Sequence, residues 1–397
     1  MSKISGARYI AETFKGYGVT HVFYMEIMLP TSLIEMERLG IRRIVTHSEK
    51  AAAYMADGYA RLAQRPGVCM AQSVGAANLA AGLQDAFLAH APVMALAGSK
   101  PLRFQQRNAY QEINHLPLYD VLTKYNVKVD ELAQLPQVLP QAFRQATTGT
   151  PGPVHVDLPG LFGEFIEGAE GEMEVVVEPA YGRYPVWRPV PDEADLRRAA
   201  EVLGRAGRPV LVVGRGAVIS GAGQEVQKLA ERLSIPVATS PDGKAILPDD
   251  HALYLGPVGG YGRPSANQIV SQADLVFFVG CGTGDQVTRN WTLPAPGAPV
   301  VQLDIEPAEV GRNYPGALGL VGDARETLRR LLACVEGDGP GDEWARHAGE
   351  IARKWRRAMA PLRESDAVPV RPERLCHEIT ASLPENAVVV ADTGYSA

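Results

Sequence analysis

Short apolar runs alternate with longer segments of helical periodicity along the sequence, and this alternation restricts the fold more than any other feature. Over the first 160 residues it predicts five short strands with amphipathic helices between them. Strands of this kind form a parallel sheet that helices cover on both faces. The predicted strands span 19–24, 43–46, 67–72, 92–97 and 153–158, and the predicted helices span 7–17, 31–39, 49–63, 76–90 and 132–147.

The predicted sheet also indicates where a ligand would bind. Doubly wound α/β sheets bind ligands beyond the carboxyl ends of their parallel strands. In this sequence those ends are followed by the loops after Tyr24, Thr46, Gln72 and Ala97. We therefore expect the functional residues in these loops.

The remaining sequence divides at two proline-rich stretches. We predict a first α/β domain over 1–165, a linker over 166–192 and a second, Rossmann-like α/β domain over 193–360. Residues 361–397 are predicted to hold a linker and the truncated start of a third domain, with a helix at 373–383 and a strand at 387–390 before Asp392-Thr393-Gly394. In the second domain we expect strands at 209–213, 236–238, 275–279 and 300–305, and helices at 194–206, 223–234 and 324–335.

Composition excludes several classes of function. The formal net charge of −6 argues against a nucleic-acid binder, which needs a dominant basic surface. The four cysteines lack CxxC spacing and the eight histidines lack paired helical spacing, so we predict no disulfide framework and no metal site in this chain. The N-terminus has no apolar signal-peptide core, and no apolar run approaches the roughly 20 residues that cross a bilayer. We expect a cytoplasmic protein without a membrane or nucleic-acid partner.

The most informative window begins at Glu49, between a predicted strand and an alanine-rich helix. A carboxylate at a helix N-terminus is favoured by the helix dipole, so Glu49 alone is explained by helix formation. Its surroundings are more specific, because several short motifs follow in order. They are Glu49-x-x-Ala-x-x-x-Ala56-Asp57-Gly58-Tyr59-Ala60-Arg61, Ser73, Gly75-Ala76-Ala77-Asn78, Tyr110-Gln111-Glu112, Pro151-Gly152-Pro153, Gly284-Asp285-Gln286 and Asp304-Ile305-Glu306-Pro307.

In order and spacing, and over essentially all 397 residues, these motifs resemble the thiamin-diphosphate (ThDP) enzymes, nearest to the acetolactate synthase (acetohydroxyacid synthase) branch. The resemblance implies that residues 1–165 are the ThDP pyrimidine-binding domain. It also implies a role for Glu49: in that family a glutamate hydrogen-bonds N1′ of the pyrimidine and favours the 4′-imino tautomer, which removes the C2 proton of the thiazolium. The cofactor carries the chemistry, and the protein supplies orientation and electrostatics.

The resemblance implies four further cofactor-binding positions, namely Tyr24, Ser73, Asn78 and Gln111. The residue types alone leave alternatives open: Asn78 could cap or turn a helix, and Gln111 could make a loop hydrogen bond. The family holds Mg²⁺ and the diphosphate in a third domain, on a Gly-Asp-Gly…Asn segment that this sequence lacks. Homodimer or homotetramer assembly, or a separate chain with the diphosphate-binding domain, is implied as well.

Three loops depart from the family pattern. The usual Tyr-Pro-Gly-Gly reads Tyr24-Met25-Glu26-Ile27, the usual His before the glutamate is Ser48, and Ser-Gly-Pro-Gly is shortened to Ser73-Val74-Gly75. We predict a transferase-type carboligase, acetolactate-synthase-like, that acts on a small 2-oxo acid in the complete protein, and we expect this chain alone to be incomplete. The alternatives are a 2-oxo acid decarboxylase, a 2-hydroxyacyl-CoA lyase or, in another class, a non-catalytic subunit that needs a partner chain.

A second candidate site lies in the central domain. Glycines follow two predicted strands and an aspartate ends a third, a pattern that lets phosphates approach the backbone and a ribose hydroxyl find an acceptor. Acetolactate synthases hold FAD in this domain, but Thr150, Gly282 and Gln286 stand at family arginine positions and Tyr261 at a family histidine. FAD, another adenine nucleotide, CoA and no ligand all remain open. The candidate nucleotide residues are Gly214, Gly216, Gly280, Gly282 and Asp304.

Overall fold

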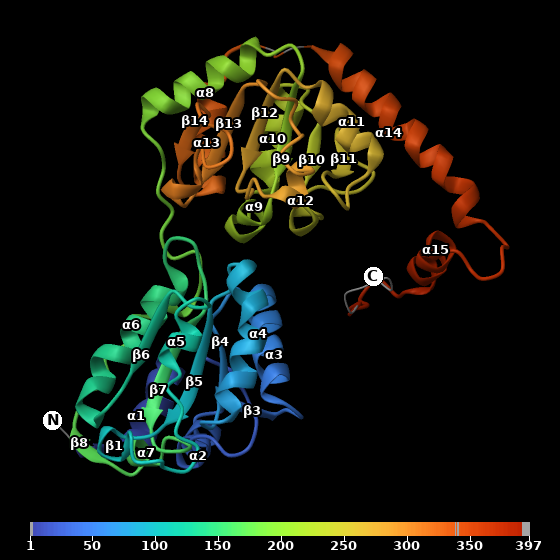
Figure 1. The fold of residues 1–397 in the computed structure, drawn as a ribbon. Coiled ribbons are helices and arrows are strands. Elements are labelled where there is room, and N and C mark those ends of the chain that lie inside the picture. The colour runs from blue at the N-terminus through green and yellow to red at the C-terminus, as the bar shows by residue number, and fades with distance from the viewer. Residues whose placement is uncertain (1–2, 338, 340, 391–397) are drawn as a thin grey trace. The chain divides into compact units, whose positions relative to one another are not determined.

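A computed structural model describes residues 3–337, 339 and 341–390, and Figure 1 shows their fold. The chain forms two compact units. The first runs to Val190 and includes two short returning segments, Ile305–Pro307 and Val321–Glu326. The second holds the other residues. Each unit contains one six-stranded sheet, so the prediction of two doubly wound α/β domains is confirmed.

The sheet of the first unit has the strand order β3-β2-β4-β5-β7-β6, and all of its strand pairs are parallel. Each predicted strand and helix of this region is present within a few residues of its expected bounds. The edge strand β6 was not predicted. The strands are β2 (His21–Tyr24), β3 (Arg42–Val45), β4 (Gly67–Ala71), β5 (Val93–Ser99), β6 (Tyr125–Lys128) and β7 (Val154–Pro159), and the helices are α1 (Gly6–Gly16), α2 (Pro30–Arg38), α3 (Glu49–Ala63), α4 (Gly75–Leu88), α5 (Leu116–Tyr119), α6 (Leu135–Thr147) and α7 (Glu164–Glu167).

Helices cover both faces of this sheet, and the two faces differ in the size of their side chains. On one face α1, α2 and α6 bury large residues. Phe143 of α6 stacks on Tyr17, which directly follows α1, with the ring centroids 4.0 Å apart. On the other face α3 and α4 pack through alanines. A Cβ on Gly82 of α4 would lie 2.6 Å from Cβ of Ala53 on α3, so the two helices are in close contact. This contact brings the N-terminal turns of α3 and α4 together.

The segment predicted as a linker is folded onto the first unit up to Val190. Its strand β8 (Glu170–Glu172) pairs antiparallel with β1 (Lys3–Ser5). Met173 and Tyr184 are buried, and the Tyr184 hydroxyl donates to the carbonyl of Ala60 at 2.9 Å. Only the last residues of the expected linker therefore lie outside the first unit.

The sheet of the second unit has the order β11-β10-β9-β12-β13-β14. The pairs of β10 with β11, β9 with β10, β9 with β12, and β12 with β13 are parallel. The observed β9 and β12 have the predicted bounds, whereas β11, β14 and α11 were not predicted. The strands are β9 (Pro209–Val213), β10 (Val237–Thr239), β11 (Tyr254–Pro257), β12 (Leu275–Val279), β13 (Val300–Asp304) and β14 (Leu318–Val321), and the helices are α8 (Glu193–Arg205), α9 (Arg215–Ser220), α10 (Gly223–Arg232), α11 (Pro264–Gln272), α12 (Asp285–Thr288) and α13 (Ala324–Cys334).

The C-terminal segment contains two helices, α14 (Asp342–Arg363) and α15 (Pro372–Ser382), which contact each other. The strand predicted at 387–390 is wrong: these residues have no regular secondary structure, and Val388 and Val390 are more than four-fifths exposed. A strand needs a neighbour for its backbone N–H and C=O groups, and this segment belongs to none of the three sheets of the described residues. Asp392-Thr393-Gly394 lies outside the described residues. Among the described helices, none has the length and apolarity to cross a bilayer.

Candidate functional site

Glu49 is the first residue of α3, and the sequence around it explains why the helix begins there. Ser48 has extended backbone angles, and its hydroxyl accepts a hydrogen bond from N–H of Ala51 at 3.1 Å. A serine N-cap of this kind satisfies an N–H group that has no partner within the helix. The Ser48 that replaces the family histidine is thus a helix cap. The half-buried carboxylate of Glu49 lies at the positive end of the helix dipole.

Two residues of α4 hold this carboxylate. Nδ2 of Asn78 donates to Oε2 of Glu49 at 3.2 Å. Gly75 lies against it so closely that a Cβ there would be 2.5 Å from Oε1 of Glu49. The structure therefore brings Glu49 and Asn78, both predicted from the sequence, into direct contact. Gly75 was not predicted as a site residue. The sequence feature that could have indicated it is a glycine at the first position of a helix, where a side chain would collide with the neighbouring carboxylate.

Ser73 and Gln111 form a second contact, in the loops after β4 and β5. The buried hydroxyl of Ser73 donates to the backbone carbonyl of Gln111 at 2.7 Å. Gln111 has a positive φ of 56°, an unusual conformation for a residue with a side chain, and the Ser73 contact helps to fix it. Oε1 of Gln111 is buried and has no hydrogen-bond partner among the described residues. An orphaned buried acceptor in a loop at the carboxyl edge of a sheet is typical of a ligand site.

Tyr24, the fifth predicted site residue of this unit, ends β2. Its carbonyl accepts hydrogen bonds from N–H of Thr46 at 2.9 Å and from Oγ1 of Thr46 at 3.2 Å. Burial raises the pKa of the Tyr24 hydroxyl, which favours the neutral form. The hydrogen bonds to the Tyr24 carbonyl thus help to fix the loop between β3 and α3, which leads to Glu49.

The glycines predicted for nucleotide binding lie in the second unit, and three of them contact one another. N–H of Gly214 donates to the carbonyl of Val279 at 3.0 Å, and N–H of Gly216 donates to the carbonyl of Gly280 at 2.8 Å. A Cβ on Gly280 would lie 2.5 Å from N of Ala217. Close packing of the loops after β9 and β12 is therefore sufficient to explain these glycines.

The other two nucleotide candidates are placed differently. A Cβ on Gly282 would meet nothing within 4 Å, and Asp304 ends β13. Sequence reasoning did not identify a cleft of about 450 Å³ in the same unit. Its lining includes Gly259, Gly260, Asn267 and Arg289. Nucleotide binding by this unit stays a prediction.

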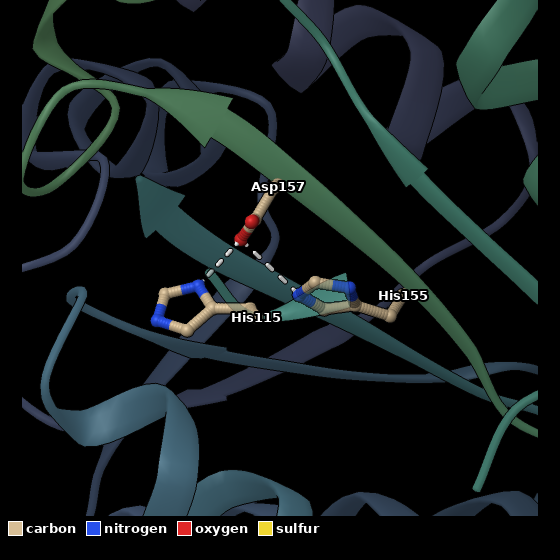
Figure 2. Close-up of side chains that lie close together, drawn as sticks. All are labelled: His115, His155 and Asp157. Carbon is tan, nitrogen blue, oxygen red and sulfur yellow. Dashed lines mark hydrogen bonds and ion pairs between the residues drawn. The ribbon is translucent and has the colours of Figure 1, made fainter. Parts of the chain in front are cut away.

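Sequence reasoning also missed a buried group of chemically active side chains in the first unit. His115, His155 and Asp157 each offer one ligand atom, and these atoms lie within 4.8 Å of one another. Figure 2 shows the two imidazole rings directed at the same Asp157 carboxylate. The sequence signal was weak, because His155 and Asp157 share a strand but His115 is 40 residues earlier in the chain.

Comparison with known proteins gives two family matches. Residues 4–118 match the model of the thiamine pyrophosphate enzyme N-terminal TPP binding domain, and residues 196–331 match the model of the thiamine pyrophosphate enzyme central domain. The first range contains β2, β3, β4 and β5 of the first unit's sheet, and the second contains all six strands of the second unit's sheet. The Glu49–Asn78 pair and the Ser73–Gln111 contact lie within the first match.

Several curated proteins are similar over most of the chain. A probable acetolactate synthase large subunit of Methanocaldococcus jannaschii is 34% identical over 406 residues, which cover 98% of this chain and 67% of that protein. The acetolactate synthase isozyme 1 large subunit of Escherichia coli K12 is 30% identical, with 99% of this chain and 68% of that protein covered. An acetolactate synthase of Arthrospira platensis is 33% identical, with 84% and 58% covered. The chain thus spans between 58% and 68% of the length of these three relatives.

Proposed function

This chain belongs to the thiamine pyrophosphate enzymes of the acetolactate synthase large-subunit family, and we propose that it acts as a ThDP-dependent carboligase on a small 2-oxo acid. The observation that carries the proposal is the placement of Glu49. Its carboxylate lies at a helix N-terminus, accepts a hydrogen bond from Asn78 and rests against the backbone of Gly75. In this proposal Glu49 is the group that activates the cofactor.

The residues present fit such a cofactor on two observations. Oε1 of Gln111 is a buried acceptor without a partner among the described residues, and Gly75 provides a backbone surface that any side chain would fill. Glu49, Asn78, Ser73, Gln111 and Tyr24 would hold the pyrimidine side of ThDP. When bound, ThDP supplies a nucleophilic carbon that adds to the carbonyl of the 2-oxo acid.

The contributions of the chain follow from its contacts. Asn78 donates to Oε2 of Glu49 and orients the carboxylate, so that Oε1 is the oxygen that can accept or release a proton. The carboxylate of Glu49 lies at the N-terminus of α3, where the helix dipole interacts favourably with a negative charge. Ser73 fixes the backbone of Gln111, which presents the unpartnered amide oxygen. Each contact positions a polar group before any ligand binds, which is how a preorganised site lowers a barrier.

The test is turnover of pyruvate by the complete enzyme, this chain together with the diphosphate-binding domain, supplied with ThDP and Mg²⁺, with products identified by NMR. We expect acetolactate, and we expect Glu49→Gln to reduce the rate by about 10²–10⁴-fold, the range for loss of a general acid–base group. The matched control is Glu193→Gln, the same substitution at the first residue of α8, where the carboxylate is 71% exposed. The control should retain the parent rate. Equal rates in the Glu49 and Glu193 variants would contradict the proposal.

The alternative reactions differ in their products. Acetaldehyde without acetolactate would identify a 2-oxo acid decarboxylase, and cleavage of a 2-hydroxyacyl-CoA would identify a lyase. Turnover that requires a separate polypeptide would identify the second class of function, a subunit whose partner chain carries the diphosphate-binding domain and its Mg²⁺ site. An intact-mass spectrum of the purified sample would then reveal the partner as a second polypeptide.

Self-assembly is part of the proposal. Several large apolar side chains of α3 and α4 are exposed, and Leu62 and Leu88 are at least three-quarters exposed. Large apolar side chains exposed on two helices that pack together are a feature of protein interfaces. We infer a homodimer or homotetramer that these two helices help to form, in the cytoplasm. Size-exclusion chromatography with light scattering tests the assembly, since a monomeric mass would contradict it.

A further inference from the structure

The buried group formed by His115, His155 and Asp157 is separate from the Glu49 site. His155 and Asp157 are two residues apart on β7, so their side chains lie on the same face of the sheet. His115 immediately precedes α5 and is directed at the same carboxylate (Figure 2). The relative exposures of the three residues are 0%, 0% and 1%. Groups of this chemistry are almost never fully buried without partners that compensate for lost solvation.

A neighbouring amide fixes the tautomer of His155. Nδ2 of Asn126, on β6, donates to the carbonyl of Leu116 at 2.6 Å and to Oδ1 of Asp120 at 2.6 Å. Oδ1 of Asn126 therefore faces Nδ1 of His155, at 2.8 Å, as an acceptor. Nδ1 of His155 must then carry the hydrogen, and Nε2 of the neutral ring has a lone pair.

This lone pair faces another acceptor. Nε2 of His155 lies 3.3 Å from Oδ1 of Asp157 and has no hydrogen-bond partner among the described residues. The Asp157 carboxylate oxygen and the His155 lone pair are both acceptors, so they satisfy each other only through a cation or a proton that lies between them.

The third residue offers the same kind of atom. Nδ1 of His115 lies 2.9 Å from Oδ1 of Asp157, and Nε2 of His115 is buried without a partner among the described residues. Bonds of about 2.0–2.2 Å to a tetrahedral Zn²⁺ place ligand atoms roughly 3.3 Å apart. The separations of 2.9 Å and 3.3 Å in this group are close to that value.

We propose that His115, His155 and Asp157 form a binding site for a divalent transition-metal ion of the Zn²⁺ class, with Asn126 as the partner that orients His155. Two imidazoles and a carboxylate are a ligand set that suits such ions and not Ca²⁺ or Mg²⁺, which prefer oxygen ligands. A ligating histidine typically donates its other ring N–H to a carbonyl or carboxylate oxygen, as His155 does to Asn126.

The bound ion would stabilise one part of the first unit. It would tie β7 to the residue that ends the loop containing Gln111, whose carbonyl is held by Ser73. The site would therefore stabilise the fold and this loop and would take no part in the reaction. The inference does not depend on the proposed function, because its evidence comes from a separate set of side chains.

The test uses Zn²⁺ itself as the probe. The intact protein is incubated with Zn²⁺, dialysed against metal-free buffer and measured by inductively coupled plasma mass spectrometry. We expect about one ion per chain in the parent protein, and the same in the His377→Gln control, which removes an exposed histidine of α15. His155→Gln should retain less than about a tenth of that amount, and Asn126→Ala should weaken the affinity by about 10–100-fold.

If His155→Gln does not fold, a second measurement on the parent protein still tests the proposal. The chelator-treated parent is titrated with Co²⁺, whose visible absorption bands report coordination by imidazole and carboxylate. Saturable bands at about one equivalent, displaced by Zn²⁺, support the site. A parent chain that retains no Zn²⁺ and develops no Co²⁺ bands would overturn the proposal, and a shared proton would then explain the contact between His155 and Asp157.

Discussion

The contact between Gly75 and Glu49 makes a sharp prediction about the substitution Gly75→Ala. The new Cβ would lie 2.5 Å from Oε1, 2.9 Å from Cγ and 3.0 Å from Cδ of Glu49. Ordinary van der Waals contact begins near 3.4 Å, so Oε1 must withdraw by about 0.9 Å. The carboxylate is the far end of a flexible side chain, and it can move without unfolding the chain. Its hydrogen bond from Asn78 would change in the same movement.

The expected result is a loss of activity without a loss of fold. A displacement of about 1 Å in a catalytic group can cost roughly 10²-fold in rate, and we expect a loss of this size in pyruvate turnover. Alanine has a better helix propensity than glycine by up to about 1 kcal/mol, which offsets part of the crowding. The free energy of unfolding, measured in urea, should therefore change by less than about 1 kcal/mol.

Gly58→Ala is the matched control. Gly58 is a helical glycine of α3, and a Cβ there would meet nothing within 4 Å. We expect this variant to gain about 0.5–1 kcal/mol of stability and to keep the parent rate. The reasoning is refuted if folded Gly75→Ala turns over pyruvate at the parent rate, because the position of the Glu49 carboxylate would then not matter.

Two further predictions concern stability and thiol reactivity. Arg8 donates a hydrogen bond to Glu35 at 2.8 Å, and this bond lowers the pKa of Glu35. Glu35→Gln should therefore reduce the free energy of unfolding by about 0.5–1 kcal/mol near neutral pH, and this difference should disappear as the pH falls through the lowered pKa. A difference in the free energy of unfolding that persists in acid would contradict the pairing. Burial raises the pKa of Cys69, and it raises the pKa of Cys281 to about 12. A maleimide at about pH 8 should therefore label the exposed Cys376, and it should leave Cys69 and Cys281 unlabelled until urea unfolds the chain. Mass spectrometry of the labelled peptides checks this result, and fast labelling of Cys69 in the folded chain would count against the buried strand β4.

The sequence predicted correctly those helices and strands whose residue pattern matches which of their side chains are buried. The helix α3 has its predicted bounds because a serine cap, an N-terminal carboxylate and alanines at helical spacing all indicate the same start and face. The strands β9 and β12 also have their predicted bounds, because every residue in them is buried and apolar runs are then unambiguous.

The elements that were missed lack such signals. The edge strand β6 contains tyrosine, asparagine and lysine, all half-buried, and therefore shows neither an apolar run nor clear alternation. The error at 387–390 has the opposite cause: an apolar run predicted a strand, but a strand forms only where a neighbouring strand pairs with it. Local sequence does not report whether that neighbour exists.

The site shows the same division. Glu49 and Asn78 could be chosen from their motifs, but their hydrogen bond depends on the close packing of α3 against α4. The contact of His115 with Asp157 joins residues 42 positions apart, and only the fold brings them together. Individual residue types are therefore readable from the sequence, whereas pairings across the fold are not.

The central claim is that Glu49 activates ThDP, and the most direct measurement is the rate of hydrogen–deuterium exchange at C2 of ThDP bound to the protein, followed by NMR after an acid quench. The account predicts that the parent protein accelerates this exchange and that Glu49→Gln loses about 10²-fold or more of the acceleration, while Glu193→Gln loses none. Near-parent exchange in Glu49→Gln, with ThDP bound, would contradict the account.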